Sequence, residues 1–167
     1  MRSVEASHIY EGLWQGSWPA PGTTVRDAGF SAVVLCAAEY QPPQHVAETF
    51  RMFRQWPPPA YSVQDPFPGV HVVYAPNDDD PDRFPSSKEL TLAIRAARQT
   101  TLLLSRGKKV LVTCMQGRNR SGLVSALALH NLLGVSGLEA ASMVQNKRPN
   151  SLMNPQFVLA LSRLQAV

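Results

Sequence analysis

Short apolar runs alternate with amphipathic stretches along this chain, which predicts strands covered by helices. Apolar residues dominate three runs, 30–36, 70–74 and 110–112. Apolar runs of this length are typical of strands buried on both faces of a sheet. An earlier segment, 9–17, mixes aromatic and polar residues and predicts an opening strand with a turn.

Helix signals lie between and after these runs. Ser86 and Glu89 have the spacing of a capping box, and apolar residues at helical spacing then predict a helix to about Arg106. Asn154 followed by Pro155 predicts the start of a last helix, since proline favours the first helical position. The other helical stretches are predicted at 23–29, 43–55, 121–133 and 136–146.

Strands that alternate with helices and end in a helical tail predict an α/β fold, with a central, mostly parallel sheet flanked by helices in a three-layer sandwich. A length of 167 residues fits one domain spanning residues 1–167. The proline-rich stretch 56–59 lies in a loop that runs to Gly69, long enough to suggest a functional role.

Composition narrows the functional classes. Hydrophobic residues make up 44% of the chain and charged residues 17%, as in globular proteins rather than disordered ones. The net charge is +4 without a run of five basic residues, so nothing requires a nucleic-acid partner. Neither a signal peptide nor an apolar run long enough for a membrane segment is evident, and two cysteines favour a reducing, cytoplasmic location.

The stretch 110–122, VLVTCMQGRNRSG, carries the chemistry. It predicts a buried strand, a tight loop and the start of a helix, an order in which backbone N–H groups converge on an anion. Cys114 lies at the mouth of the helix near two arginines, where a thiolate nucleophile is favoured. Arg120 can grip two phosphoryl oxygens with its planar fork, and Gly117 lets the loop curl. Ser121 could donate a hydrogen bond to the sulfur.

The spacing Cys-x5-Arg-Ser resembles the signature loop of cysteine-dependent dual-specificity protein phosphatases, in the protein tyrosine phosphatase superfamily. The resemblance extends over essentially the whole chain. It implies a phosphate loop made of Met115, Gln116, Gly117, Arg118, Asn119 and Arg120. One position departs from the family: Thr113 stands where a histidine usually precedes the cysteine. This departure leaves open a slower enzyme, or a module that binds phosphate without efficient turnover. A buried cysteine followed by a basic helix cap is the structural alternative.

A general acid is expected in the acidic segment 75–82, which directly follows a predicted strand. Family spacing after Pro76 favours Asp79, while counting back from the cysteine favours Asp82. A solvated acidic turn is the alternative for any one of these carboxylates. A calcium loop formed by Asp78, Asp80, Asp82 and Glu89 is disfavoured, because Arg83 and Pro85 occupy unsuitable positions.

Three further residues are candidates for a role near the loop. In the phosphoinositide-directed branch of the family, a cysteine at the place of Cys36 can form a disulfide with the nucleophile, so Cys36 is a possible redox partner or else a small buried side chain. Arg118 and Arg148 could add positive field. The four histidines show no paired metal-ligand spacing, and we expect neither a metal nor a cofactor.

The favoured hypothesis is a phosphomonoester hydrolase that works through a phosphocysteine intermediate. The resemblance implies a phosphorylated protein substrate, phosphotyrosine first and phosphoserine or phosphothreonine second. A phosphoinositide, an RNA 5′-phosphate or a glucan remains an alternative, and so does a catalytically weak phosphate-binding module. The sequence indicates no oligomeric state.

Overall fold

The computed structural model describes residues 4–53 and 60–167, so the predicted proline-rich stretch 56–59 lies outside the described residues. The strands are β1 (Ala6–Tyr10), β2 (Leu13–Ser17), β3 (Ala32–Ala37), β4 (His71–Asn77) and β5 (Val110–Cys114). The helices are α1 (Thr24–Asp27), the 3-10 turn η1 (Pro43–His45), α2 (Val46–Phe53), α3 (Ser87–Ser105), α4 (Arg120–Leu133), α5 (Gly137–Lys147) and α6 (Pro155–Ser162).

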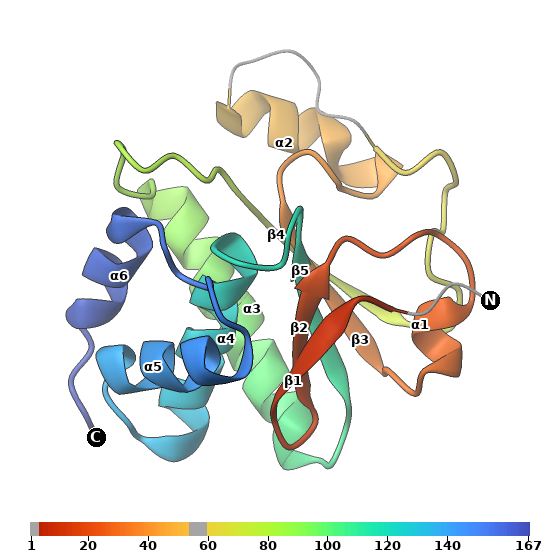
Figure 1. Cartoon of the computed structure of the whole chain (residues 1–167). Helices are drawn as coiled ribbons and strands as arrows, with labels where there is room; N and C mark the ends of the chain where they lie inside the picture. Colours follow the sequence, from red (N-terminus) through yellow and green to blue (C-terminus); the bar gives the residue numbers. More distant parts are fainter. Residues whose placement is uncertain (1–3, 54–59) are drawn as a thin grey trace.

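The five strands form one sheet in the order β1-β2-β5-β3-β4 (Figure 1). Among the strands of the described residues, only β1 and β2 pair antiparallel, so the predicted opening strand is a hairpin. The remaining neighbours are parallel, which confirms the predicted mostly parallel sheet. The strand β5 is central, and its carboxyl end therefore meets those of β2 and β3 at one edge. Ligands of open α/β sheets bind at this edge.

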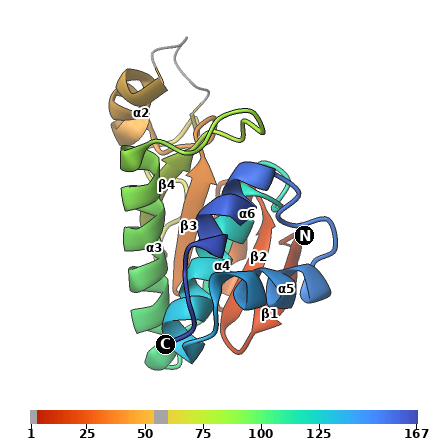
Figure 2. The ribbon, with the colours of Figure 1, turned by 90° about the vertical axis from the view of Figure 1, so that its left-hand side faces the viewer.

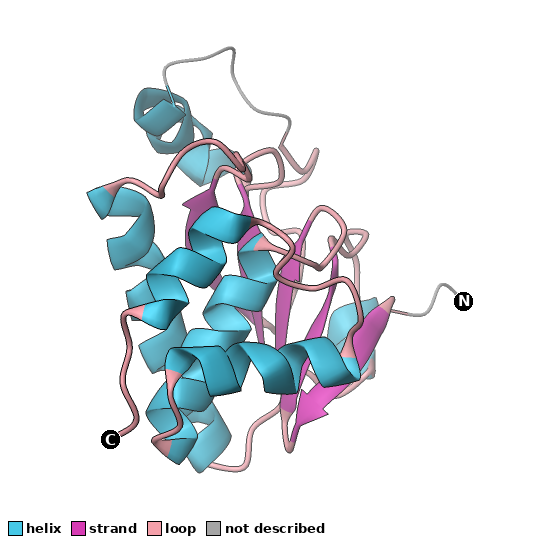
Figure 3. Cartoon of the chain, turned by 60° about the vertical axis from the view of Figure 1, so that its left-hand side comes forward, coloured by secondary structure: helices cyan, strands magenta, loops and turns pink. Residues whose placement is uncertain are grey.

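Helices α3 to α6 cover one face of the sheet, as Figures 2 and 3 show. Alternate strand residues face this layer, among them Val34, Cys36, Val112 and Cys114, and they join one apolar cluster with α4. Burial of these side chains is the main stabilising term of the fold.

The second face has a thinner cover. Val25 of α1 packs with Tyr61 and Phe67 against Leu35 and other sheet residues. Part of the long predicted loop therefore has a structural role, because it seals the sheet with two buried aromatic rings.

Local signals account for the helix ends. Ser86 and Glu89 form both bonds of the capping box that begins α3, and Asn154 accepts a bond from the Gln156 N–H at the start of α6. Within the described segments, no single helix is long and apolar enough to cross a bilayer. Helices α4 and α5 reach that length and apolarity only together, across a bend of 120°.

Candidate active site

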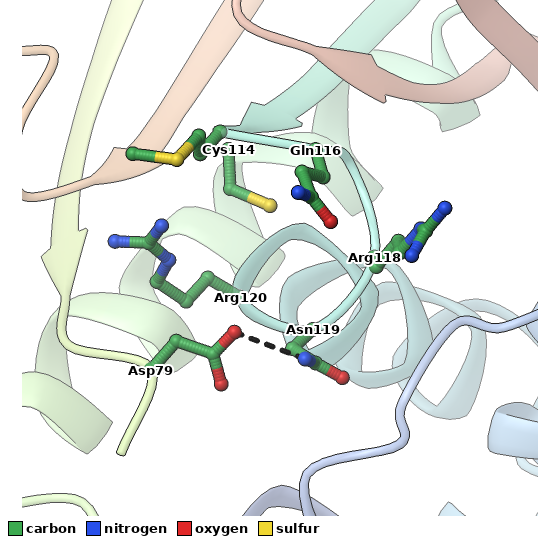
Figure 4. Close-up of a pocket in the computed structure, with 7 residues that line it drawn as sticks. Asp79, Cys114, Gln116, Arg118, Asn119 and Arg120 are labelled. Atoms are coloured by element: carbon green, nitrogen blue, oxygen red, sulfur yellow. Dashed lines mark hydrogen bonds between the residues drawn. The ribbon is translucent and has the colours of Figure 1, made fainter.

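The signature loop forms a pocket of about 200 Å³ at the carboxyl end of β5 (Figure 4). Its lining consists of Asp79, Cys114, Met115, Gln116, Arg118, Asn119 and Arg120. The fold thus brings the expected acid, separated by 35 positions from the cysteine, to the rim of the loop that holds it.

Cys114 ends β5 and lies at the floor of the pocket, with 4% of its surface exposed. Its Sγ lies 3.2 Å from the Oγ of Ser121, which is fully buried in the first turn of α4. A serine hydroxyl at this distance can donate to a thiolate sulfur. These two predicted side chains are therefore in direct contact.

Arg120 is buried beside the cysteine, with 6% of its surface exposed. Its Nη1 donates to both Glu39 carboxylate oxygens, at 2.9 and 2.8 Å, and to the Asn77 carbonyl at 3.2 Å. Its Nε is buried without a hydrogen-bond partner among the described residues. One side of the guanidinium is thus fixed by protein, while its Nε donor is unsatisfied among the described residues.

The charge on Arg120 is secure. Burial works against the ionised guanidinium, but the Glu39 carboxylate, with Cys114 and Asp79, outweighs burial and raises the pKa of Arg120 above its ordinary value. Glu39 is not among the predicted site residues, because it follows the buried strand β3 without any motif of its own.

Three successive carbonyls of the loop are bonded from outside the pocket. Arg148 donates to the Gln116 carbonyl at 3.0 Å and to the Gly117 carbonyl at 2.6 Å, and Gln15 donates to the latter at 2.9 Å. The Leu152 N–H donates to the Arg118 carbonyl at 3.2 Å.

This bonding decides where the loop amides point. In a trans peptide the N–H points away from the carbonyl of the same unit, and the described chain has no cis peptide. The N–H groups of residues 117, 118 and 119 therefore face away from the partners of those carbonyls, toward the inside of the loop. Such a row of donors forms a cradle with the geometry to bind an anion.

Gly117 has φ +67°, the left-handed region that favours glycine. A Cβ there would lie 2.3 Å from the backbone carbon of Gly16, so the loop also packs directly against β2. The helix that follows has no side-chain cap, since the Asn119 oxygen accepts from the Asn154 N–H instead. The first-turn donors of α4 lack the usual side-chain acceptor.

Asp79 is exposed at the rim, and two amides hold it. Asn119 donates to its Oδ2 at 2.9 Å, as drawn in Figure 4, and Asn154 donates to its Oδ1 at 2.7 Å. Asp82 does not line the pocket. Its N–H donates to the Asp80 carboxylate within the turn. The geometry favours Asp79 over Asp82, and the acid role stays a prediction.

The carboxylate of Glu89 is bonded within the protein. Glu89, the last residue of the disfavoured calcium pattern, accepts bonds from Arg83 and from the Asp78 and Ser86 N–H groups. Within residues 4–53 and 60–167, no group of three His, Cys, Asp or Glu side chains is placed to hold a metal ion.

Thr113 and Cys36 lie behind the loop. The Thr113 hydroxyl donates to the Val34 carbonyl at 2.8 Å, so its one proton is directed at β3 and not at the sulfur. Cys36 follows Leu35, which pairs with Thr113, so Cys36 and Cys114 occupy adjacent positions on neighbouring strands. Burial, and then the charge of Cys114, raise the pKa of the Cys36 thiol well above its ordinary value.

Arg148 was expected only to add positive charge near the loop, but in the structure it makes specific hydrogen bonds. Its side chain is only 11% exposed, and besides the two loop carbonyls it bonds Ser7 and Glu5 of the N-terminal segment. Gln15, a fully buried polar residue within the apolar surroundings of β2, was also not predicted to support the loop. A polar side chain in such a strand is the signal that could have identified it.

Solved structures match nearly the whole chain. A mouse protein assigned as a dual specificity phosphatase and complexed with zinc tungstate has a TM-score of 0.69 at 25% identity, over 97% of this chain and 87% of the other. Human DUSP28 has a TM-score of 0.68 at 24% identity, over 97% and 95% of the two chains. The chain has the dual-specificity phosphatase fold.

This dual-specificity phosphatase fold also occurs in PTPMT1. Its complex with PI(5)P matches with a TM-score of 0.68 at 18% identity, over 93% of this chain and 92% of that one. No family model matches the sequence, and no curated protein is detectably similar to it. The neighbours are consistent with phosphatase activity of the tyrosine phosphatase superfamily, and they do not decide the substrate.

Proposed function

We propose that this protein hydrolyses phosphomonoesters through a phosphocysteine intermediate, as a single phosphatase domain acting in the cytoplasm. The observation that carries the proposal is the unpartnered Nε of Arg120, buried beside Cys114 in a pocket of about 200 Å³. A buried donor without a partner is unfavourable, and an anionic ligand would satisfy it. The loop amides offer further donors to the same ligand.

The reaction runs in two displacements. The Cys114 sulfur attacks phosphorus in line, the S–P bond forms as the ester P–O bond breaks, and Asp79 gives its proton to the leaving oxygen. The Asp79 carboxylate then takes a proton from the water that attacks the phosphocysteine. Ser121 supports the sulfur as it leaves, at 3.2 Å. Arg120 and the loop amides stabilise the equatorial oxygens throughout.

The substrate class we favour is a phosphorylated protein, phosphotyrosine first. A phosphoinositide is the alternative, because PTPMT1 with bound PI(5)P shares the fold. Tungstate, present in the mouse structure, is a tetrahedral oxyanion like phosphate, which agrees with an oxyanion ligand for this loop.

A second candidate, a phosphate-binding module with weak turnover, is favoured by Thr113. Its hydroxyl is directed at β3, and so it does not replace the hydrogen bond that a histidine could provide near the loop. A loop that lacks this support can still bind oxyanions through its amides and Arg120.

Hydrolysis of an aryl phosphate by the wild type, Cys114→Ser and Thr113→His distinguishes the two, with vanadate binding measured in parallel. The enzyme is expected to turn over with the wild type and to lose activity in Cys114→Ser. A large gain in Thr113→His would mean that the natural chain is impaired. Vanadate binding without any turnover would overturn the enzyme and support the module.

A further inference from the structure

The segment between β4 and α3, which carries Asp79, runs beside α6 (Figure 2). Three contacts join them in order along the helix. Asn154 donates to Asp79 at 2.7 Å, and Gln156 donates to the Pro81 carbonyl at 3.2 Å. The Arg163 guanidinium then lies 4.5 Å from the ring centre of Phe84, a cation–π contact.

The segment is also anchored on its other side. The Asp78 N–H donates to Glu89 at 2.8 Å, and Glu89 is 2% exposed at the start of α3. Asp79 itself is exposed. Burial therefore does not fix its side chain, and hydrogen bonds must do so.

Asn154 is at the centre of those bonds. Its Oδ1 accepts from the Gln156 N–H at 2.9 Å and caps α6, while its Nδ2 holds the Asp79 carboxylate. Its backbone N–H donates to the Asn119 oxygen at 3.1 Å, and the Asn119 amide donates to the second Asp79 oxygen. The side chains of Asp79, Asn119 and Asn154, closed through the Asn154 backbone N–H, form a ring of hydrogen bonds that ties Asp79 to both the phosphate loop and α6.

We infer that the start of α6 aims the general acid, with Asn154 as the positioning residue that orients Asp79 toward the leaving oxygen. The inference rests on the proposed function. The orientation of Asp79 should affect the rate most for esters with a poor leaving group, because their hydrolysis depends most on proton transfer to the leaving oxygen. A nitrophenolate leaves without much assistance, whereas a phenolate needs the proton.

Asn154→Ser is the variant that separates the two duties of Asn154. Serine retains an oxygen that can cap α6 but lacks the amide that reaches Asp79. Ser136→Ala is the matched control, since it removes a helix cap that does not line the pocket. The Ser136 Oγ accepts a hydrogen bond from the Glu139 N–H at 3.1 Å and caps α5. Asp79→Asn gives the full effect of losing the acid.

The probes are phenyl phosphate and 4-nitrophenyl phosphate. We expect kcat/KM for phenyl phosphate, which reports the steps up to phosphocysteine formation, to fall about tenfold in Asn154→Ser, part of the 10²–10⁴-fold that general acid catalysis contributes. The kcat/KM for 4-nitrophenyl phosphate should change less than about threefold, since Asn154 does not touch the phosphoryl group and a nitrophenolate needs little protonation. Ser136→Ala should preserve the wild-type ratio of the two substrates.

Equal losses of kcat/KM on both substrates in Asn154→Ser would overturn the inference, because a general structural defect has no preference for the leaving group. The same holds if Asp79→Asn shows no such preference, since Asp79 is then not the acid. Hydrogen exchange of residues 77–85 provides a readout independent of turnover. It should rise in Asn154→Ser and not in Ser136→Ala. A wild type without turnover refutes the proposed function, and unchanged exchange then refutes the positioning role separately.

Discussion

Replacing Arg148 with alanine should loosen the phosphate loop from the outside. The side chain is 11% exposed and donates to two successive loop carbonyls, at 3.0 and 2.6 Å. Without it, the peptide unit between Gln116 and Gly117 has no outside partner among the bonds described above. Gln15 still holds the next carbonyl. The N–H of Gly117 is then free to turn away from a bound oxyanion.

The size of the effect follows from these bonds. Hydrogen bonds that involve a charged group contribute about 1.5–3 kcal/mol each, and one of the two carbonyls keeps a second donor. We therefore expect the free energy of unfolding to fall by about 2–4 kcal/mol. Removal of an oxyanion donor lowers rates by about 10²–10³, and a donor that is only misplaced should lower kcat/KM by about ten- to fiftyfold.

Steady-state kinetics on an aryl phosphate, vanadate binding and urea unfolding measure these effects. Arg148→Lys keeps the charge but cannot bond two carbonyls in a fixed fork, so it should recover only part of the loss. Glu5→Gln removes the exposed ion pair of Arg148 and should change stability by less than about 1 kcal/mol, with kcat/KM preserved. Unchanged vanadate affinity in Arg148→Ala, or full recovery in Arg148→Lys, would refute the argument from peptide orientation.

Three further predictions follow from the same contacts. Gly117→Ala should lower kcat/KM in steady-state assays by more than about 100-fold, because its Cβ would meet the backbone of β2 at 2.3 Å. The circular dichroism spectrum of the variant should remain native, and an active Gly117→Ala variant would contradict the prediction. Burial opposes ionisation of Glu89, but Arg83 and two backbone donors lower its pKa below 4.5. The stability that ionised Glu89 contributes is therefore present above pH 4.5 and is lost as the pH falls through the lowered pKa of the folded state. Arg83→Ala should thus lower the free energy of urea unfolding by about 1–3 kcal/mol at pH 7, and the difference should shrink at low pH rather than persist. Mild peroxide should convert Cys114 to a sulfenic acid that Cys36 attacks with loss of water, giving a disulfide detectable by mass spectrometry, whereas oxidation of Cys114 alone would exclude Cys36 as redox partner.

The centre of the fold and the nucleophile were predictable because their signals are local. A buried run followed by a loop and a helix start predicted β5 and α4, and the capping box at Ser86 predicted α3 to within a residue. The spacing of Cys114, Arg120 and Ser121 is a property of one short segment. Their mutual contacts then follow from the geometry of that segment alone.

The partners of these residues were not predictable, because they come from distant parts of the chain. Glu39 lies 81 positions from Arg120, and Asn154 lies 75 positions from Asp79. Asn154 could be identified as a helix cap, since capping is local, but its second bond depends on how α6 packs. Tyr61 and Phe67 lie in the predicted loop, but their burial was not predictable, because it depends on contacts with the second face of the sheet.

The outer support of the cradle has a consequence for folding. Arg148 meets Ser7 and Glu5 across 141 and 143 positions, so these bonds join distant parts of the chain. Loops of this length close late, and contacts of such high sequence separation slow folding. A refolding chain therefore exposes the Cys114 thiol before the outer support of its loop has formed. Phosphate or vanadate added during refolding should bind only the last species to form, so the ligand would slow unfolding without accelerating the early steps.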